Sequence, residues 1–109
     1  MSINTVNATL LNAVAATGTS NPVIFQGARS QHSMQVTATG APTEVQVLLQ
    51  GSLDRTNYST IATFDMAAGN SLGDIISVDA ANAIAIRAVL NTLTGGTSPT
   101  VTVTTSSQI

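Results

Sequence analysis

The chain has 109 residues, of which 43% are apolar, 3% aromatic and 7% charged, and its formal net charge is -2. This length fits one domain around a single core, and the charged fraction lies far below the roughly 25% of an ordinary soluble domain. There is no lysine, and the only cations are Arg29, Arg55 and Arg87. A nucleic-acid interface needs clustered cations, so the composition argues against nucleic acid as a partner.

The polar character comes instead from threonine, serine and asparagine, which make up about a third of the residues. The threonines alternate with valine and alanine, a pattern typical of strands rather than of disorder. Net charge near zero promotes association. We therefore expect a protein that works in an assembled form.

The sequence also lacks the residues and segments that cysteine-based sites, signal peptides and membrane spans require. With no cysteine, the chain has no disulfide framework, thiolate zinc site or cysteine nucleophile. The first residues lack the basic segment of a signal peptide, and no apolar run reaches the length of a membrane span. We expect a protein that is made in a cytoplasm, is not secreted by a signal peptide and has no membrane contact.

In chain order, residues 7–16 fit either a helix or a strand, because the apolar positions Leu10, Leu11 and Val14 have helical spacing while two alternating sets also exist. We interpret this stretch as a strand. The following runs alternate or are β-prone and are separated by turn clusters. They lie at residues 23–26, 29–39, 44–50, 58–64, 74–78, 83–90 and 100–105. About eight short strands predict an all-β, antiparallel β-sandwich or jelly-roll-like fold, as one domain over residues 1–109.

The sequence also predicts the ends and the loops of this domain. Residues 1–5 and 104–109 are neutral and polar, and we expect them to be short arms that order on assembly. Residues 91–99, which include a Gly-Gly pair, are expected to form the last loop.

The central hairpin carries the clearest motif. Val45, Val47 and Leu49 alternate with polar residues, a Gly51-Ser52-x-Asp54 turn follows, and Tyr58 opens the second strand. This hairpin, the run at residues 83–88 and the stretch at residues 93–103 together resemble a family of small β-sandwich structural proteins of tailed-phage virions. The hairpin resembles discoidin-like carbohydrate-binding domains less closely.

The resemblance implies a function. Members of the phage family are often capsid decoration or cement proteins that stand as trimers on the shell, so it implies a homotrimer bound to the major capsid protein on the capsid surface. Two positions depart from the pattern: Tyr58 stands where tryptophan is more frequent, and Arg55 where glycine is more frequent. The second departure makes a tight primed turn less expected.

The sequence offers few residues that could form a catalytic or metal-binding site. His32 is the single histidine, and we interpret it as solvated or as part of an interface, since no Gly-x-Ser-x-Gly turn presents a nucleophile. Asp54 and Asn57 are a thin set of calcium ligands, so we interpret Asp54 as the cap of its own turn. We predict no enzyme activity, no cofactor and no metal.

Four residues are candidates for an interface. Leu48 breaks the alternation of its strand, and Arg87 is a lone charge in an apolar strand, interpreted as outward-facing or paired with an aspartate. Ile61 and Phe64 lie three apart, so they share a face only if the strand contains a bulge. We expect one of them to point outward into a partner.

Two functions from different classes remain. The first is a structural virion protein, a capsid decoration subunit whose work is adhesion to copies of itself and to the shell. The alternative is a glycan-binding module or another component of a phage tail or fibre, with Tyr58 stacking on a sugar. The poverty of aromatic and charged residues counts against the glycan module.

Overall fold

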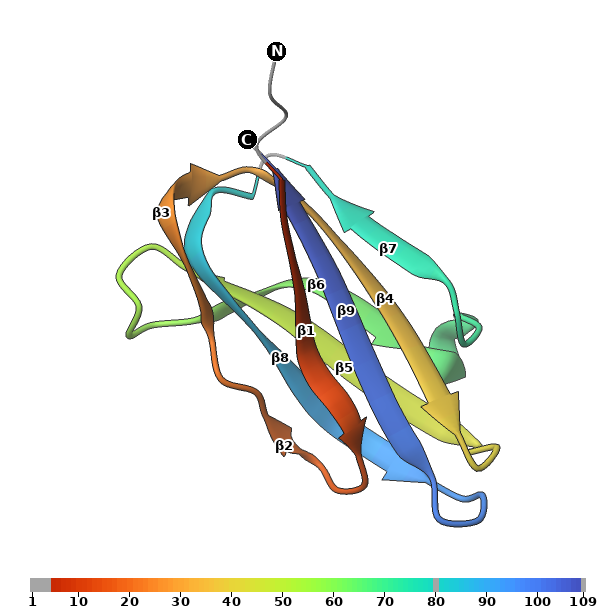
Figure 1. Cartoon of the computed structure of the whole chain (residues 1–109). Helices are drawn as coiled ribbons and strands as arrows, with labels where there is room; N and C mark the ends of the chain where they lie inside the picture. The colour runs from red at the N-terminus through yellow and green to blue at the C-terminus, as the bar shows by residue number, and fades with distance from the viewer. Residues whose placement is uncertain (1–4, 80, 109) are drawn as a thin grey trace.

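The protein is a sandwich of two antiparallel sheets in a computed structural model that describes residues 5–79 and 81–108 (Figure 1). The elements are β1 Thr5–Val14, β2 Gly18–Thr19, β3 Val23–Arg29, β4 Gln31–Thr39, β5 Glu44–Ser52, β6 Ser59–Asp65, the 3-10 turn η1 Met66–Ala68, β7 Ile75–Val78, β8 Ala83–Thr94 and β9 Thr100–Gln108. The predicted all-β sandwich is confirmed, with nine strands in place of about eight.

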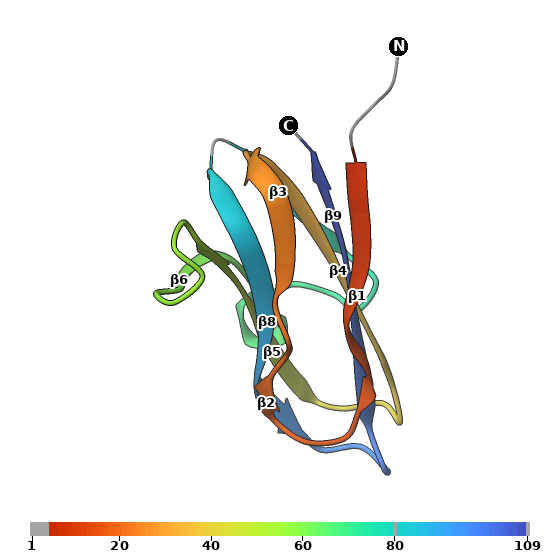
Figure 2. The same ribbon diagram turned by 60° about the vertical axis from the view of Figure 1, so that its left-hand side comes forward.

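One sheet has the order β1-β9-β4-β7, and the other has the order β2-β8-β5-β6 with β3 also paired to β8. Figure 2 shows the two sheets as separate layers, with β1, β4 and β9 on one side and β3, β5 and β8 on the other. The loop between β5 and β6 projects away from both layers in the two views. The sheets therefore have two inner sides, which pack together, and two outer sides.

Strand ends differ from the predicted ones at the C-terminal half of the chain. β8 continues to Thr94 through the predicted loop, because Glu44 pairs with Thr94 after a register shift between Gln46 and Val47. β9 continues to Gln108 and is paired on both sides, with β1 and with β4. The prediction of a C-terminal arm over residues 104–109 is therefore wrong as far as Gln108, while Ile109 and residues 1–4 of the predicted N-terminal arm lie outside the described residues.

The ambiguous stretch at residues 7–16 is a strand, as predicted, and it is β1. It forms one edge of its sheet and pairs with β9 from Thr5 to Val14 through two register shifts. Only Leu11 of this strand is fully buried in the core. The helical spacing seen in the sequence comes from these shifts, which move apolar residues out of strict alternation.

The core fills the space between the sheets with alternate residues of the central strands. The side chains exposed by 1% or less include Met34 and Val36 of β4, Val45, Val47 and Leu49 of β5, Phe64 of β6, Ile86 and Leu90 of β8, and Val101 and Val103 of β9. Each of these strands places its intervening polar residues outside. The period of two in the sequence thus defines both the core and the outer faces.

Two loops join the sheets at one end of the sandwich. Gly40, between β4 and β5, and Gly96, between β8 and β9, both have positive φ angles, 80° and 72°. The amide of Thr97 donates to the carbonyl of Gly40 at 2.8 Å, and a Cβ on Gly96 would collide with the backbone of Gly40 and Ala41. Glycine is required here because the two backbones touch.

Candidate functional site

The outer side of the β1-β9-β4-β7 sheet carries no charge. None of the residues in these four strands is Asp, Glu, Lys or Arg. The side chains that face outward are short and neutral, and they include Asn7, Thr9, Ser33, Gln35, Thr37, Thr39, Ile75, Ser77, Thr100, Thr102, Thr104 and Ser106. We call this set the uncharged face.

Polar side chains of the uncharged face bond to one another across strands. The Oγ atoms of Ser33 and Ser77 lie 2.9 Å apart, and Thr39 Oγ1 lies 2.6 Å from Thr100 Oγ1. Gln35 Nε2 donates to the carbonyl of Gly73 at 2.9 Å. A partner that covers this face therefore removes water from groups that already have protein partners, which lowers the desolvation cost.

The uncharged face is hollowed near its middle. A shallow depression of about 300 Å³ lies over β1, β9, β4 and β7, and its lining includes Gln35, Thr104 and Ile75. The Ile75 side chain is 64% exposed, which makes it one of the large apolar residues in contact with water. The uncharged face therefore has one projecting apolar side chain, Ile75, next to a shallow depression.

The outer side of the other sheet carries the charges that the first sheet lacks. Glu44, Asp65 and Arg87 all lie on β5, β6 or β8 and face outward with Gln46 and Gln50. Gln46 Nε2 donates to Asp65 Oδ2 at 3.1 Å, and Arg87 Nε donates to Gln50 Oε1 at 2.9 Å. We call this set, together with Leu48, Thr63 and Val89, the charged face.

Arg87 is the outward-facing residue predicted from the sequence. Its guanidinium carbon lies 4.1 Å from the centroid of the Tyr58 ring, a cation–π contact, and the side chain is half-buried. Within residues 5–79 and 81–108 no aspartate forms the ion pair considered as the alternative. Because Arg87 covers one face of the Tyr58 ring, that face is not open for stacking on a sugar.

The four predicted interface residues separate into two pairs. Leu48 is half-buried on the charged face, between Thr63 and Val89 on the neighbouring strands. Ile61 is the extra residue of a bulge, because Leu49 pairs with Ala62 while Gln50 pairs with Thr60. The bulge turns Ile61 toward Gly51, where it packs against the core.

Phe64 is fully buried, with 0% exposure. The expectation that Ile61 or Phe64 points outward is therefore wrong, since the bulge lets both residues face inward on one short strand. Of the four predicted interface residues, Leu48 and Arg87 lie on one outer face, Phe64 lies in the core, and Ile61 is half-buried against it.

The Gly51-Ser52-x-Asp54 turn is capped as predicted. Asp54 accepts hydrogen bonds from the amides of Asn57 and Thr56 at 2.7 and 2.8 Å, from Asn57 Nδ2 at 2.7 Å and from Ser52 Oγ at 2.9 Å. These bonds, the two backbone ones first, lower the pKa of Asp54 well below its usual 3.8. The carboxylate is used inside its own turn, which explains its place without a cation.

Arg55 of the same turn adopts a left-handed conformation with a φ angle of 64°. This is the position where the resembling family more often has glycine, and the φ angle supplies the physical reason. Arg55 therefore has a backbone conformation that glycine adopts more easily.

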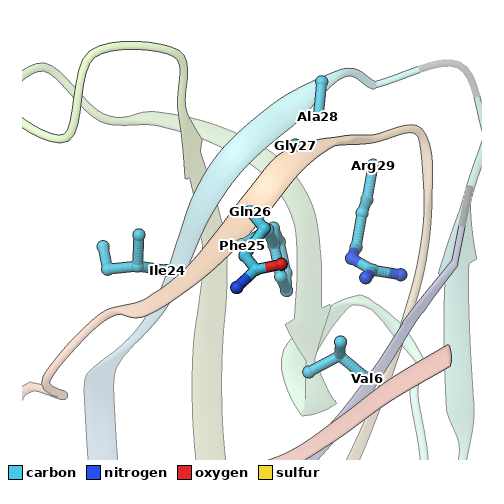
Figure 3. A pocket seen from close by; sticks show the side chains of 7 residues that line it. All are labelled: Val6, Ile24, Phe25, Gln26, Gly27, Ala28 and Arg29. Carbon is cyan, nitrogen blue, oxygen red and sulfur yellow. The ribbon is translucent and has the colours of Figure 1, made fainter. Parts of the chain in front are cut away.

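A cavity lies at the edge of the sandwich between β1 and β3. It has a volume of about 460 Å³ and is lined by Val6 and residues 24–29 (Figure 3). β3 pairs in register with β8 at Val23, Ile24 and Arg29, and residues 25–28 between them fall in a register shift of the ladder. We call this hollow the β3 cavity.

Arg29 lies along the wall of the β3 cavity and is only 7% exposed. Its guanidinium carbon is 5.2 Å from the centroid of the Phe25 ring, and that ring stacks with His32 at a centroid distance of 6.2 Å. The burial of Arg29 was not predicted, because the alternation pattern indicated only that Arg29 begins a strand. The aromatic residue four positions earlier was the available signal.

His32 is buried, with 1% exposure, so the expectation of a solvated or interface histidine is wrong. Its Nε2 lies 3.0 Å from the carbonyl oxygens of Arg29 and of Ala81, and its Nδ1 lies 2.8 Å from Ser107 Oγ. Carbonyl oxygens only accept, so Nε2 carries the proton and donates. The continuation of β9 to Gln108 brings Ser107 under the ring, which is why the shorter predicted strand missed this partner.

Metal and membrane features were searched in the part of the chain that the structure describes. In that part, no three His, Asp or Glu side chains come together as a metal site. The described residues also contain no helix that is long and apolar enough to cross a membrane.

No protein-family model and no curated protein sequence matches this chain. Solved structures share its fold. The SPBc2 prophage-derived protein YomS has a TM-score of 0.71 and 9% identity, over 98% of this chain and 95% of that one. The PBSX exported protein XepA has a TM-score of 0.73 and 12% identity over 98% of this chain, which spans 38% of XepA.

The same fold occurs in a third structure, CBM32-3 from a family 31 glycoside hydrolase of Clostridium perfringens. Its TM-score is 0.58 and its identity 14%, over 95% of this chain and 75% of that one. At such identities the likeness establishes the β-sandwich fold.

Proposed function

We propose that this chain is a non-enzymatic structural protein of a phage virion, a capsid decoration (cement) subunit that binds the major capsid protein at the capsid surface and stabilises the head. The observation that carries the proposal is the uncharged face, a whole sheet surface without Asp, Glu, Lys or Arg. The fold shared with the prophage-derived YomS supports the phage setting.

The uncharged face is the surface that lies against the shell in this proposal. Four strands of nine or ten residues at most cover roughly 30 Å by 19 Å, about 600 Å². A standard stable interface buries about 800 Å² on each partner, so a single copy binds weakly. Several of its polar groups already bond within the protein, at 2.9 Å between Ser33 and Ser77 for example, so removing water from these groups costs less free energy.

In this proposal a homotrimer binds the shell more tightly than a single copy does. Three linked copies present three uncharged faces to one shell, and the second and third contacts form at a high effective concentration. Leu48 and Arg87 lie on the opposite sheet and remain free of the shell, which makes the charged face the surface for contacts between copies. Light scattering is expected to give three times the chain mass of 11.0 kDa.

The test is co-sedimentation with shells that are assembled from the major capsid protein and lack this chain. Thr104 and Thr56 are both exposed threonines, one on the uncharged face and one in the β5–β6 loop, which projects away from both sheets. Thr104→Glu is expected to weaken shell binding by at least about tenfold, because a buried unpaired carboxylate costs several kcal/mol. Thr56→Glu is the matched control, because it lies outside both faces, and it is expected to bind as the wild type does. Equal binding by both variants would exclude the uncharged face.

A second candidate function is a glycan-binding module of a phage tail or fibre. The observation that favours it is the fold shared with CBM32-3 at a TM-score of 0.58. The ring of Tyr58 is covered by Arg87, which argues against stacking on a sugar at that place. A glycan array with clear binding, together with no sedimentation with shells, would establish this function in place of decoration.

A further inference from the structure

We propose that the uncharged face also binds a second copy of this chain, so that two such sheets pack face to face about a two-fold axis. The pairing goes beyond the decoration function, because it needs no shell and uses the face opposite to the one assigned to contacts within the trimer. Three observations carry it: a projecting side chain beside a depression, the absence of charge, and the area of the face.

The projection and the depression lie next to each other across the strands. The register places Gln35 of β4 between Ile75 of β7 and Thr104 of β9, and all three belong to one outward row (Figure 1). The depression of about 300 Å³ lies between this row and the next one, where Ser33 pairs with Ser106. Its centre is therefore displaced from Ile75 by one to two strand spacings, about 5 to 10 Å.

The depression exists because the side chains around it are short or point away from it. Met34 and Thr105 line it although their side chains are 0% and 4% exposed, so main chain forms its floor. Ser33 and Ser106 at its sides have small side chains. The Ile75 side chain, which is 64% exposed, is the kind of apolar group that such a hollow accepts from another copy.

A projection beside a hollow makes the face complementary to itself. When a two-fold axis passes midway between them, Ile75 of each copy meets the depression of the other, and the contact closes after two copies. Because Ile75 and the depression are displaced across the strands, this axis runs parallel to the strands. The strands of the two sheets are then aligned, which is a usual geometry for one sheet packed on another.

The chemistry of the face also suits contact with its own copy. Groups near a two-fold axis meet the same groups of the partner, so a charge there would meet a like charge. None of the residues in the four strands is charged. Hydroxyl and amide groups both donate and accept, so Ser33 and Gln35, which lie between Ile75 and β9, can bond to their counterparts.

The area of the face predicts a weak contact. About 600 Å² on each copy gives roughly 1,200 Å² in total, the lower limit for specific, stable interfaces. We therefore expect separate species at low concentration and pairs at high concentration. One consequence rests on the proposed function: a shell and a second copy compete, because both cover Thr104 and its neighbours.

The experiment is light scattering of the full chain without shells, at concentrations from roughly 10 µM to 1 mM. We expect the mass of the species present at the lowest concentration to double. Ile75→Asp is expected to weaken this association at least tenfold, because each pair would bury two carboxylates without partners. Leu53→Asp is the matched control, since Leu53 is 66% exposed in the β5–β6 loop, and its association should equal that of the wild type.

A second variant places the charge in the depression itself. Thr104→Glu is expected to weaken the association at least tenfold as well, and both substituted positions are exposed, so the fold should be retained. No doubling of the wild-type mass, unchanged doubling in Ile75→Asp or Thr104→Glu, or loss of doubling in Leu53→Asp would overturn the pairing. Shell binding without doubling contradicts the pairing alone, and doubling without shell binding contradicts the decoration function alone.

Discussion

The two outer faces of this sandwich cover the same core but have opposite chemistry. The uncharged face has short hydroxyl and amide side chains that bond across strands, such as Thr39 to Thr100 at 2.6 Å. The charged face has long side chains with ionised ends, such as Arg87, which lies over Tyr58 and bonds to Gln50. The inner sides of both sheets contribute to one core. The shared core therefore does not account for the difference between the two outer sides.

The largest predicted difference in stability is between a substitution on the inner side of the β5-β6 pair, at Phe64, and one on its outer side, at Leu48. Phe64→Ala is expected to lower the free energy of unfolding by about 3 to 5 kcal/mol, because it leaves a cavity in the core. Leu48→Ala on the charged face should cost less than about 1.5 kcal/mol, since Leu48 is half-buried. Urea unfolding of both variants measures the difference. Similar losses would mean that Leu48 is as important to the fold as Phe64.

A second prediction compares side-chain contacts on the two faces. Arg87→Ala removes the bond to Gln50 and the contact with Tyr58, and is expected to cost about 1 to 2 kcal/mol. Thr39→Val removes one exposed bond of the uncharged face and should cost about 0.5 kcal/mol. Thermal unfolding gives both values. A larger loss of stability from Thr39→Val than from Arg87→Ala would show that side-chain contacts on the charged face do not contribute more to stability than those on the uncharged face.

The contribution of the Asp54 turn, between β5 and β6, to stability should depend on pH. Because hydrogen bonds lower the pKa of Asp54 in the folded state, its stabilising contribution is complete above the unfolded pKa of about 3.9 and is lost as pH falls toward the folded value. The melting temperatures of wild type and Asp54→Ala should therefore differ most at pH 7 and converge below about pH 4. A gap that stays constant down to pH 2 would contradict this assignment.

The smallest predicted effect is a gain. Arg55 has a φ angle of 64°, so Arg55→Gly should raise stability by about 0.5 kcal/mol, the relief of strain less the added chain entropy. Gly69 is the reverse control, because it has a φ angle of 105° and no atom near an added Cβ. Gly69→Ala should therefore lower the melting temperature through backbone strain alone, while Arg55→Gly raises it. A lower melting temperature for Arg55→Gly would refute the strain argument.

The fold could be predicted from the sequence because one local rule sets it. Alternation in runs such as Val45, Val47 and Leu49 indicates strands with one buried side, and the structure places all three in the core. Asp54 as the cap of its turn followed from short-range chemistry of the same kind. These features depend on neighbours in the sequence.

The features that were missed depend on pairing between distant strands. The bulge at Ile61, which turns Phe64 and Ile61 to the same side, appears only when β5 and β6 are placed in register. The burial of His32 needs Ser107, which is 75 residues away. The uncharged face as a surface likewise needed the order β1-β9-β4-β7, since its residues come from four separate parts of the chain.

The central claim, that the uncharged face lies against a capsid shell, can be tested by thiol accessibility. The natural chain has no cysteine, so a single introduced thiol reports one place. Thr37→Cys lies on the uncharged face and Thr63→Cys on the charged face, and both positions are exposed. The account predicts that adding shells slows maleimide labelling at Thr37→Cys at least about tenfold and leaves Thr63→Cys unchanged. Protection at Thr63→Cys alone, or at neither position while the protein sediments with shells, would contradict it.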